Sequence, residues 1–158
     1  MQWSPETIAD VAQAYRANHS LGRGDRQARL AQEQHFWAAD AVTDAAGDGT
    51  LPLELIDALL HLEPHDEALE SYVAADAIED VMRKHPGRYV AAIAERCRRD
   101  PVWARAVGGV WLDRSTWDLI PDELRALMLE PEIPQQVQRV RTRRGRKAKR
   151  QSQRGRRR

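Results

Sequence analysis

Five carboxylates in the middle of the chain have a spacing that suggests a binding site. Asp40 and Asp44 are four residues apart, so on a helix they share one face. Further along, Asp76 is followed by Glu79 and Asp80. If the two segments pack side by side, the carboxylates line one acidic groove, which suits an arginine-rich partner or a divalent cation. The alternative is a helix cap at residues 76–79 and an ordinary solvated helix face.

The last twenty residues, 139–158, are strongly basic and contain no Asp or Glu. Arg and Lys neutralise phosphates and release counterions, so the segment predicts salt-sensitive, sequence-independent binding of RNA or DNA. Arginine dominates, and its guanidinium group makes bidentate contacts with phosphate. Docking on the acidic part of the chain or on an acidic protein, or a solvated segment without a partner, are the alternatives. The candidate contacts are Arg139, Arg141, Arg143, Arg144, Arg146, Lys147, Lys149, Arg150, Arg154, Arg156, Arg157 and Arg158.

The charge of the chain is divided unevenly along its length. The whole chain has 25 Lys and Arg and 24 Asp and Glu, a net charge of +1. Twelve of the basic residues lie in residues 139–158, which leaves 13 basic against 24 acidic residues, a charge of −11, in residues 1–138. An acidic body with a basic end is typical of proteins that bind a polyanion or dock on themselves.

No combination of residues indicates catalysis or a metal site. His61 and His65 stand near acidic residues, but Pro64 lies between them and their spacing matches no zinc signature. The single cysteine, Cys97, shares an apolar stripe with Ile93, where a thiol behaves as a small core residue. Phosphate-binding glycine loops and nucleophile elbows are absent from the sequence. The sequence therefore predicts a non-catalytic protein without a metal or a cofactor.

Short amphipathic helices must position these groups, and their ends are marked in the sequence. Ser4 followed by Pro5, and Asp100 followed by Pro101, have the pattern of an N-cap and a first helical residue. No segment alternates with the period of a strand. We therefore predict an all-α fold, a single domain of about seven short helices over residues 1–132 followed by a disordered basic tail, 133–158. Stacking of helix pairs as in an α-solenoid is one arrangement of such helices.

Two further expectations concern the helices. The segment "HDEALESYVAADAIEDVMRKHPG" forms either one helix or two, because Asp76 and Glu79 have the spacing of a capping box that restarts a helix. The tryptophans divide into a buried and a partly exposed group. We expect Trp37, Trp103 and Trp111 in the core and Trp3 and Trp117 partly exposed.

Several motifs in the middle of the chain occur together in one known family. "FWAADAVTDAA", "LPLELIDALL", "YVAADAIEDVM" and "CRRDPVWARAVGGVWL" follow one another in that order. Over about residues 36–112 the chain resembles an uncharacterised bacterial family of all-helical domains of unknown function. That family has an aromatic-led motif, a central Glu-Asp motif and a closing Gly-Val-Trp motif. The resemblance places Glu79 and Asp80 in the central motif and Gly109, Val110 and Trp111 in the closing one, and it implies a helical fold without an activity.

The sequence as a whole predicts a non-catalytic helical interaction module whose arginine-rich tail binds nucleic acid. The alternative is a small bacterial immunity or antitoxin-type protein whose acidic body binds a basic partner protein. The single cysteine and the absence of a signal peptide or a long apolar run favour a soluble cytoplasmic protein that does not enter a membrane. The sequence does not indicate an oligomeric state.

Overall fold

The computed structural model describes residues 2–19 and 26–129, without the side chains of residues 26–28 and 31. Within these residues every regular element is a helix, so the predicted all-α fold is confirmed. The helices are α1 (Pro5–His19), α2 (Arg26–Gly47), α3 (Leu53–Leu60), α4 (Glu67–Val73), the π-helix η1 (Ala74–Ile78), α5 (Glu79–Lys84), α6 (Pro86–Arg99), α7 (Pro101–Gly108), α8 (Arg114–Trp117) and α9 (Asp122–Arg125).

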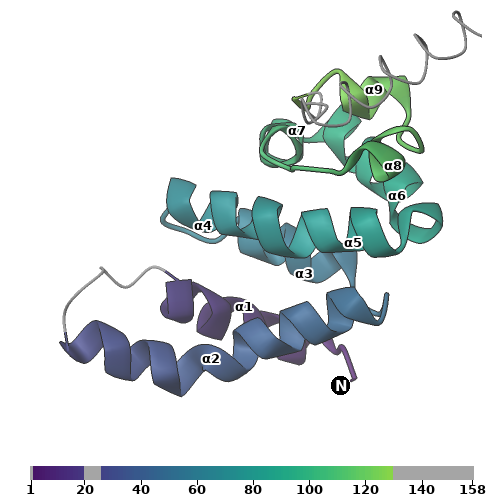
Figure 1. Cartoon of the computed structure of the whole chain (residues 1–158). Coiled ribbons are helices and arrows are strands. Elements are labelled where there is room, and N and C mark those ends of the chain that lie inside the picture. Colours follow the sequence, from purple (N-terminus) through teal and green to yellow (C-terminus); the bar gives the residue numbers. More distant parts are fainter. Residues whose placement is uncertain (1, 20–25, 130–158) are drawn as a thin grey trace, which may run out of the picture.

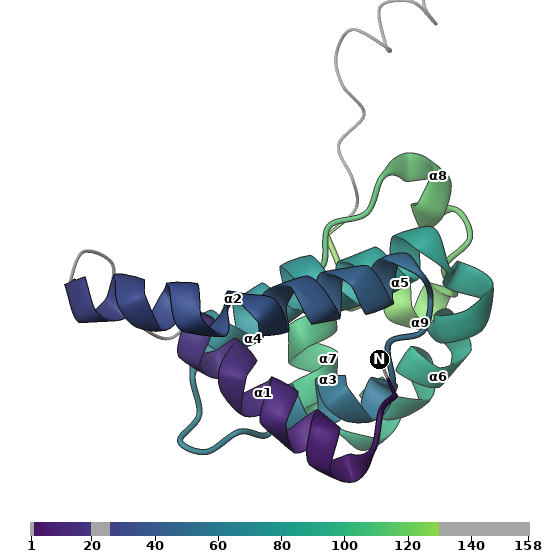
Figure 2. The same ribbon diagram turned by 90° about the horizontal axis from the view of Figure 1, so that it is seen from below.

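The helices stack in the order of the chain (Figure 1). α1 and α2 form the lower layer, α3 and the continuous rod α4–η1–α5 form the middle, and α6 to α9 form the top. Seen from below, α2 lies in front and its N-terminal turns extend past α1 (Figure 2). α2, which carries Asp40 and Asp44, and α9, the last described helix, therefore lie at opposite ends of the stack.

Local capping signals fix the helix ends that the sequence predicted. The backbone N–H of Thr7 donates to Ser4 Oγ at 3.2 Å, and α1 begins at Pro5. At the other end of the fold, the N–H of Val102 donates to Asp100 Oδ1 at 2.8 Å, and α7 begins at Pro101. Because each cap satisfies an N–H that has no partner within its helix, these ends form wherever the helices finally pack.

The turn after α2 depends on a glycine in a left-handed conformation. Gly49 has φ +68°, which L side chains rarely adopt, and a Cβ there would lie 3.0 Å from the His85 ring. His85 Nε2 in turn lies 2.8 Å from the carbonyl oxygen of Gly47. The end of α2 is thereby attached to the end of α5.

The rod α4–η1–α5 is one helix, so of the two alternatives the continuous helix is the one that the structure shows. The five residues Ala74–Ile78 form a π-helix, and neither Asp76 nor Glu79 caps a new helix. The side chain of Asp76 instead accepts a hydrogen bond from Tyr15 on α1. The wider turn brings Asp76 toward Tyr15 while Val73, Ala77 and Val81 stay buried in the core.

The core is built from the inner faces of all three layers. Its largest fully buried side chains include Tyr15, Ile56, Met82 and Trp103, and Met128 is the last buried residue among those that the structure describes. In the part of the chain that the structure describes, no helix is both long enough and apolar enough to span a membrane.

Candidate functional site

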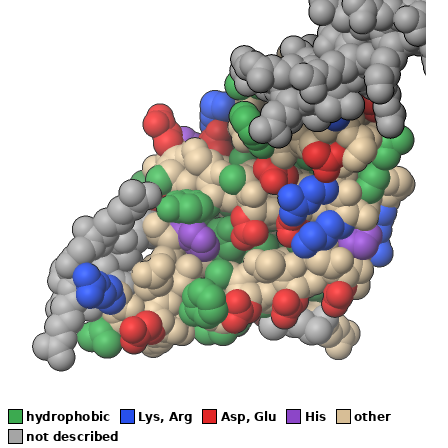
Figure 3. Space-filling view, in the orientation of Figure 1, with side chains coloured by type: hydrophobic (Ala, Val, Ile, Leu, Met, Phe, Trp, Pro, Cys, Tyr) green, Lys and Arg blue, Asp and Glu red, His purple; other side chains and the backbone are tan. Residues whose placement is uncertain are grey.

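An open groove of about 410 Å³ runs along α2 and contains two of the predicted carboxylates. Asp40 and Asp44 line it together with Asp48, which follows the end of the helix. Because Asp40 and Asp44 are four residues apart, they project from one face of α2. Figure 3 shows acidic side chains following one another along the lower edge, over this helix. The other residues lining the groove are Trp3, Trp37, Ala41, Ala45 and Thr50.

The carboxylates of this groove have no cationic partner among the described residues. Asp40, Asp44 and Asp48 are exposed, and no described Lys, Arg or His lies within ion-pair distance of them. Several acidic residues elsewhere are paired: Glu70 with Arg105 at 2.8 Å, for example, and Glu95 with Arg98 and Arg99. The α2 groove therefore concentrates uncompensated negative charge beside two indole rings. Both features attract a cation.

Asp76, the third predicted carboxylate, lies at the contact of α1 with η1. The Tyr15 hydroxyl donates to Asp76 Oδ2 at 3.1 Å. Burial raises the pKa of Asp76, and the hydrogen bond from Tyr15 partly offsets this effect. The His19 ring stacks on Tyr15 at 4.2 Å between centroids and contacts Tyr72 at 4.7 Å. Asp76 thus belongs to an interhelical contact and does not line the α2 groove.

Glu79 connects two of the motifs noted in the sequence. Its Oε2 accepts the backbone N–H of Trp111 at 3.2 Å, and its Oε1 lies 3.6 Å from Arg83 Nη1. Burial is the main cause that raises the pKa of Glu79. The central Glu-Asp motif therefore fixes the backbone of the closing Gly-Val-Trp motif, a contact between residues 32 positions apart.

Asp80 is buried and neutralised by its own helix. Its carboxylate pairs with Arg83 and with Lys84 Nζ at 2.6 Å. The five predicted carboxylates consequently fall into two groups. Asp40 and Asp44 line the α2 groove, while those of the rod α4–η1–α5 are used in contacts within the fold.

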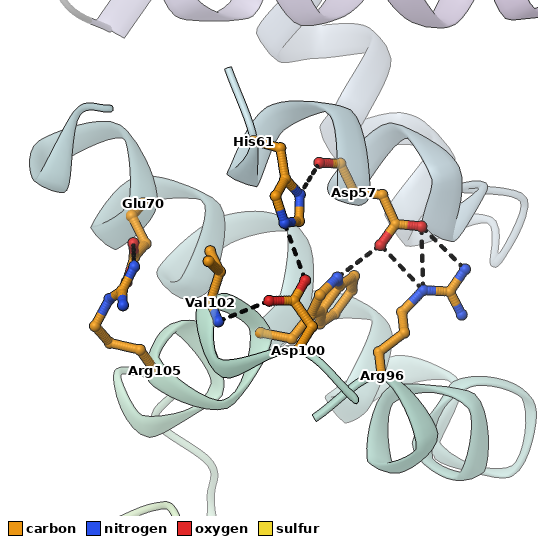
Figure 4. Close-up of polar contacts among 8 residues, drawn as sticks. Asp57, His61, Glu70, Arg96, Asp100, Val102 and Arg105 are labelled. Carbon is orange, nitrogen blue, oxygen red and sulfur yellow. Dashed lines mark hydrogen bonds and ion pairs between the residues drawn. The ribbon is translucent and has the colours of Figure 1, made fainter. Parts of the chain in front are cut away.

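Both histidines of the "HLEPHDE" segment contact described oxygen atoms. His61 Nδ1 lies 2.8 Å from the Asp57 carbonyl oxygen, and its Nε2 lies 3.0 Å from Asp100 Oδ2 (Figure 4). His65 Nε2 is 3.8 Å from Glu70. Across residues 2–19 and 26–129 no group of three or more His, Cys, Asp or Glu side chains could hold a metal ion. These histidines tie α3 and the following loop to α4 and α7.

Asp57 is the centre of a polar network that the sequence did not reveal. Arg96 Nε donates to both of its oxygens at 3.2 Å, and Trp103 Nε1 donates to Oδ1 at 2.6 Å (Figure 4). The contact joins α3 to α6 and α7. Since the partners are 39 and 46 residues away, no local spacing pattern points to them.

Cys97 is partly buried and is not poised for nucleophilic chemistry. Burial, followed by the negative charge of Asp100, raises the pKa of its thiol to about 11. At neutral pH the thiol is protonated, whereas the thiolate is the reactive form. The residue packs against the core, as its place on an apolar stripe predicted.

The division of the tryptophans differs from the prediction at three positions. Trp103 is fully buried as predicted, but Trp37 and Trp111 are 45% and 68% exposed. Trp37 lies one residue from Ala38 on the buried stripe of α2, so it points about 100° away from it. Trp111 lies in an extended segment between the buried Val110 and Leu112, where alternate residues face opposite sides.

The two remaining tryptophans flank helices. Trp117, expected to be partly exposed, is buried at the end of α8, a single turn that the sequence analysis missed. Its N-cap, Asp113, was the available signal, because its side chain accepts the N–H of Thr116 at 2.9 Å. Trp3 is partly buried as predicted and lines the α2 groove.

The predicted nucleic-acid contacts, from Arg139 to Arg158, lie outside the described residues.

A family model described as "Family of unknown function (DUF6869)" matches residues 25–145. No curated protein and no solved structure matches the chain.

Proposed function

The chain belongs to the family of unknown function DUF6869, as its motifs suggested, and for this member we propose a non-catalytic helical interaction module whose arginine-rich C-terminal segment binds nucleic acid. The observation that carries the proposal is the separation of charge along the chain. Residues 139–158 hold 12 of the 25 basic residues and none of the 24 acidic ones.

The contacts within the folded body support assigning the binding to the C-terminal segment. Most described cations are already paired with neighbouring carboxylates, which reduces their attraction for phosphate. They include Arg83 and Lys84 with Asp80, Arg96 with Asp57, Arg98 with Glu95 and Glu123, and Arg105 with Glu70. The body as a whole is acidic and repels a polyanion.

Titration of a labelled single-stranded RNA and of a DNA duplex tests this proposal. We expect the full-length protein to bind both, because an arginine-rich segment contacts phosphates without reading base edges. If six to eight cations contact phosphates at once, the slope of log affinity against log salt is about −4 to −7. The chain ending at Gln138 should not bind.

Two matched variants separate charge from side-chain geometry. Changing the ten arginines of residues 139–158 to lysine keeps the charge and should preserve the salt slope, whereas changing them to glutamine should abolish binding. The proposal is overturned if the chain ending at Gln138 binds as tightly as the full-length protein. Absence of binding by the full-length protein at about 50 mM salt would also overturn it.

A further inference from the structure

We propose that the α2 groove binds arginines of the chain's own C-terminal segment, and that Arg154, Arg156 and Arg158 are the residues it takes. The groove presents three exposed carboxylates without a described cationic partner, and Trp3 and Trp37 line it beside them. Guanidinium groups pair with carboxylates and stack on indole faces, so an arginine-rich peptide satisfies both features at once.

The spacing of the two charge patterns matches. Residues four apart on a helix are separated by about 6 Å along its axis, which is the spacing of Asp40 and Asp44. Asp48 follows the end of α2, but its backbone N–H donates to the Asp44 carbonyl oxygen at 2.9 Å, as in a helix, and so it continues the row. Alternate residues of an extended chain lie about 6.6 Å apart and point to the same side. Three arginines at every second position therefore align with the three carboxylates. The small side chains of Ala41 and Ala45 lie within the same groove and leave room for the ligand.

The sequence contains two runs of three alternating arginines after the described body. They are Arg139, Arg141 and Arg143, and Arg154, Arg156 and Arg158. Both runs carry the same charge. The length of chain between the body and each run therefore decides which of them can lie in the groove.

The distal run has the longer reach. A body of about 130 residues has a radius of gyration near 14 Å and thus a diameter of roughly 36 Å. Arg139 is ten positions after Leu129, a reach of at most roughly 33 Å, while Arg154 is 25 positions after Leu129, a reach of at most roughly 80 Å. α9 and α2 lie at opposite ends of the stack (Figure 1). The path from the end of the body to the groove therefore favours the distal run.

Docking of this kind would compete with nucleic acid for the same arginines. Nucleic acid must displace the segment from the groove. The apparent affinity of the protein for nucleic acid is therefore its intrinsic affinity multiplied by the fraction of molecules whose segment is undocked. This consequence rests on the proposed function, whereas the docking itself does not.

The docking is tested in the full-length protein by NMR of the tryptophan indole N–H signals. Signals of Trp3 and Trp37 are assigned with the Trp3→Phe and Trp37→Phe variants. The combined change Arg154→Gln, Arg156→Gln and Arg158→Gln should shift both signals. The signal of the buried Trp103 should stay unchanged.

The matched control removes the same charge at the nearer run. Arg139→Gln, Arg141→Gln and Arg143→Gln together should shift the Trp3 and Trp37 signals much less. Equal shifts from both triple variants, or no shift from the distal one, would overturn the proposal. A shift that disappears on dilution would also overturn it, because the arginines would then come from a second copy or another protein.

An independent test changes the carboxylates of the groove and measures the affinity of the protein for RNA. Asp40→Asn, Asp44→Asn and Asp48→Asn together should tighten RNA binding at low salt by about tenfold, the effect of three exposed ion pairs. The control Asp10→Asn, Glu67→Gln and Asp122→Asn changes the net charge equally at exposed positions outside the groove. Equal tightening by both would show that net charge alone acts. If the full-length protein binds no RNA, the proposed function fails and the indole signals still decide on docking.

Discussion

At the scale of single residues, the carboxylates of this protein have very different surroundings although they look alike in the sequence. Asp40 and Asp44 are exposed and unpaired among the described residues, and Asp80 is buried with two cations. Asp76 is partly buried and accepts a hydrogen bond from the Tyr15 hydroxyl. Removing a carboxylate from water without an ion pair is costly when it is ionised. Burial raises the pKa of both Asp76 and Glu79, but Glu79 also lies near Arg83 and accepts the Trp111 N–H. We therefore choose Asp76 to test how a partly buried charge opposes folding.

We predict that Asp76→Asn stabilises the protein at pH 7. Because burial raises the folded-state pKa of Asp76 above its ordinary value of 3.8, the folded state holds the proton more tightly. The free energy of unfolding consequently falls as the pH rises through this range. The neutral amide avoids that loss and can still accept the Tyr15 hydrogen bond. Thermal melting should show a Tm higher by a few degrees at pH 7.

The same change should have less effect at acid pH, because a larger fraction of the wild-type carboxyl is then protonated as well. Melting curves at pH 7 and over a series of lower pH values measure this difference, with Asp10→Asn as a control at an exposed position. A lower Tm for Asp76→Asn at pH 7 would show that the hydrogen bond from Tyr15 to the charged carboxylate outweighs the cost of burial.

At the scale of the elements, the helices are fastened by polar contacts between distant segments as well as by the apolar core. Asp57 on α3 receives hydrogen bonds from Arg96 on α6 and Trp103 on α7, and Glu70 on α4 pairs with Arg105 on α7. These contacts connect the middle and upper layers. The indole of Trp103 takes part both as a buried side chain and as a donor.

We predict that Trp103, and not Trp111, carries the packing of the upper layer. Trp103→Ala should lower the free energy of unfolding by about 3–5 kcal/mol, because it empties a fully buried site and removes a donor from Asp57. Trp111→Ala should cost within about 0.5 kcal/mol, because its side chain is 68% exposed and its backbone N–H still reaches Glu79. Urea denaturation of both variants measures the difference. Similar losses of unfolding free energy in the two variants would contradict the prediction that Trp103 carries the packing of the upper layer.

At the scale of the whole molecule, the chain combines an acidic stack of helices with a basic C-terminal segment. The last buried residue, Met128, closes the described core well before the first arginine of that segment. α2, whose side chains line the acidic groove, lies at the far end of the stack from α9 (Figure 1). Folding and the proposed binding therefore use different parts of the sequence.

We predict that the chain ending at Gln138 folds as the full-length protein does. It keeps every described helix and every residue of the core, so its circular dichroism should remain helical. Its Tm should stay within a few degrees of that of the whole chain. Loss of a cooperative melting transition would place part of the folded domain beyond residue 138.

The sequence by itself determined the helical class and many of the helix ends. Ser4, Pro5, Asp100 and Pro101 act within a few residues of their own helices, so their effects are readable before any packing is known. The charge separation is also read directly from the order of the residues in the sequence. Family membership followed from three motifs in order, and the family match over residues 25–145 agrees with it.

Only the tertiary structure decided what the side chains contact. Asp76 was read as a cap because the spacing of a capping box is local, yet its partner is Tyr15, 61 residues away. Trp111 was expected in the core, but the flanking Val110 and Leu112 occupy it. Local hydrogen bonds depend on neighbours in the chain, whereas burial and long-range pairing depend on which helices meet. The sequence accordingly placed Asp40 and Asp44 on one helix face. Only the tertiary structure packs Trp3 beside that face and so forms the groove.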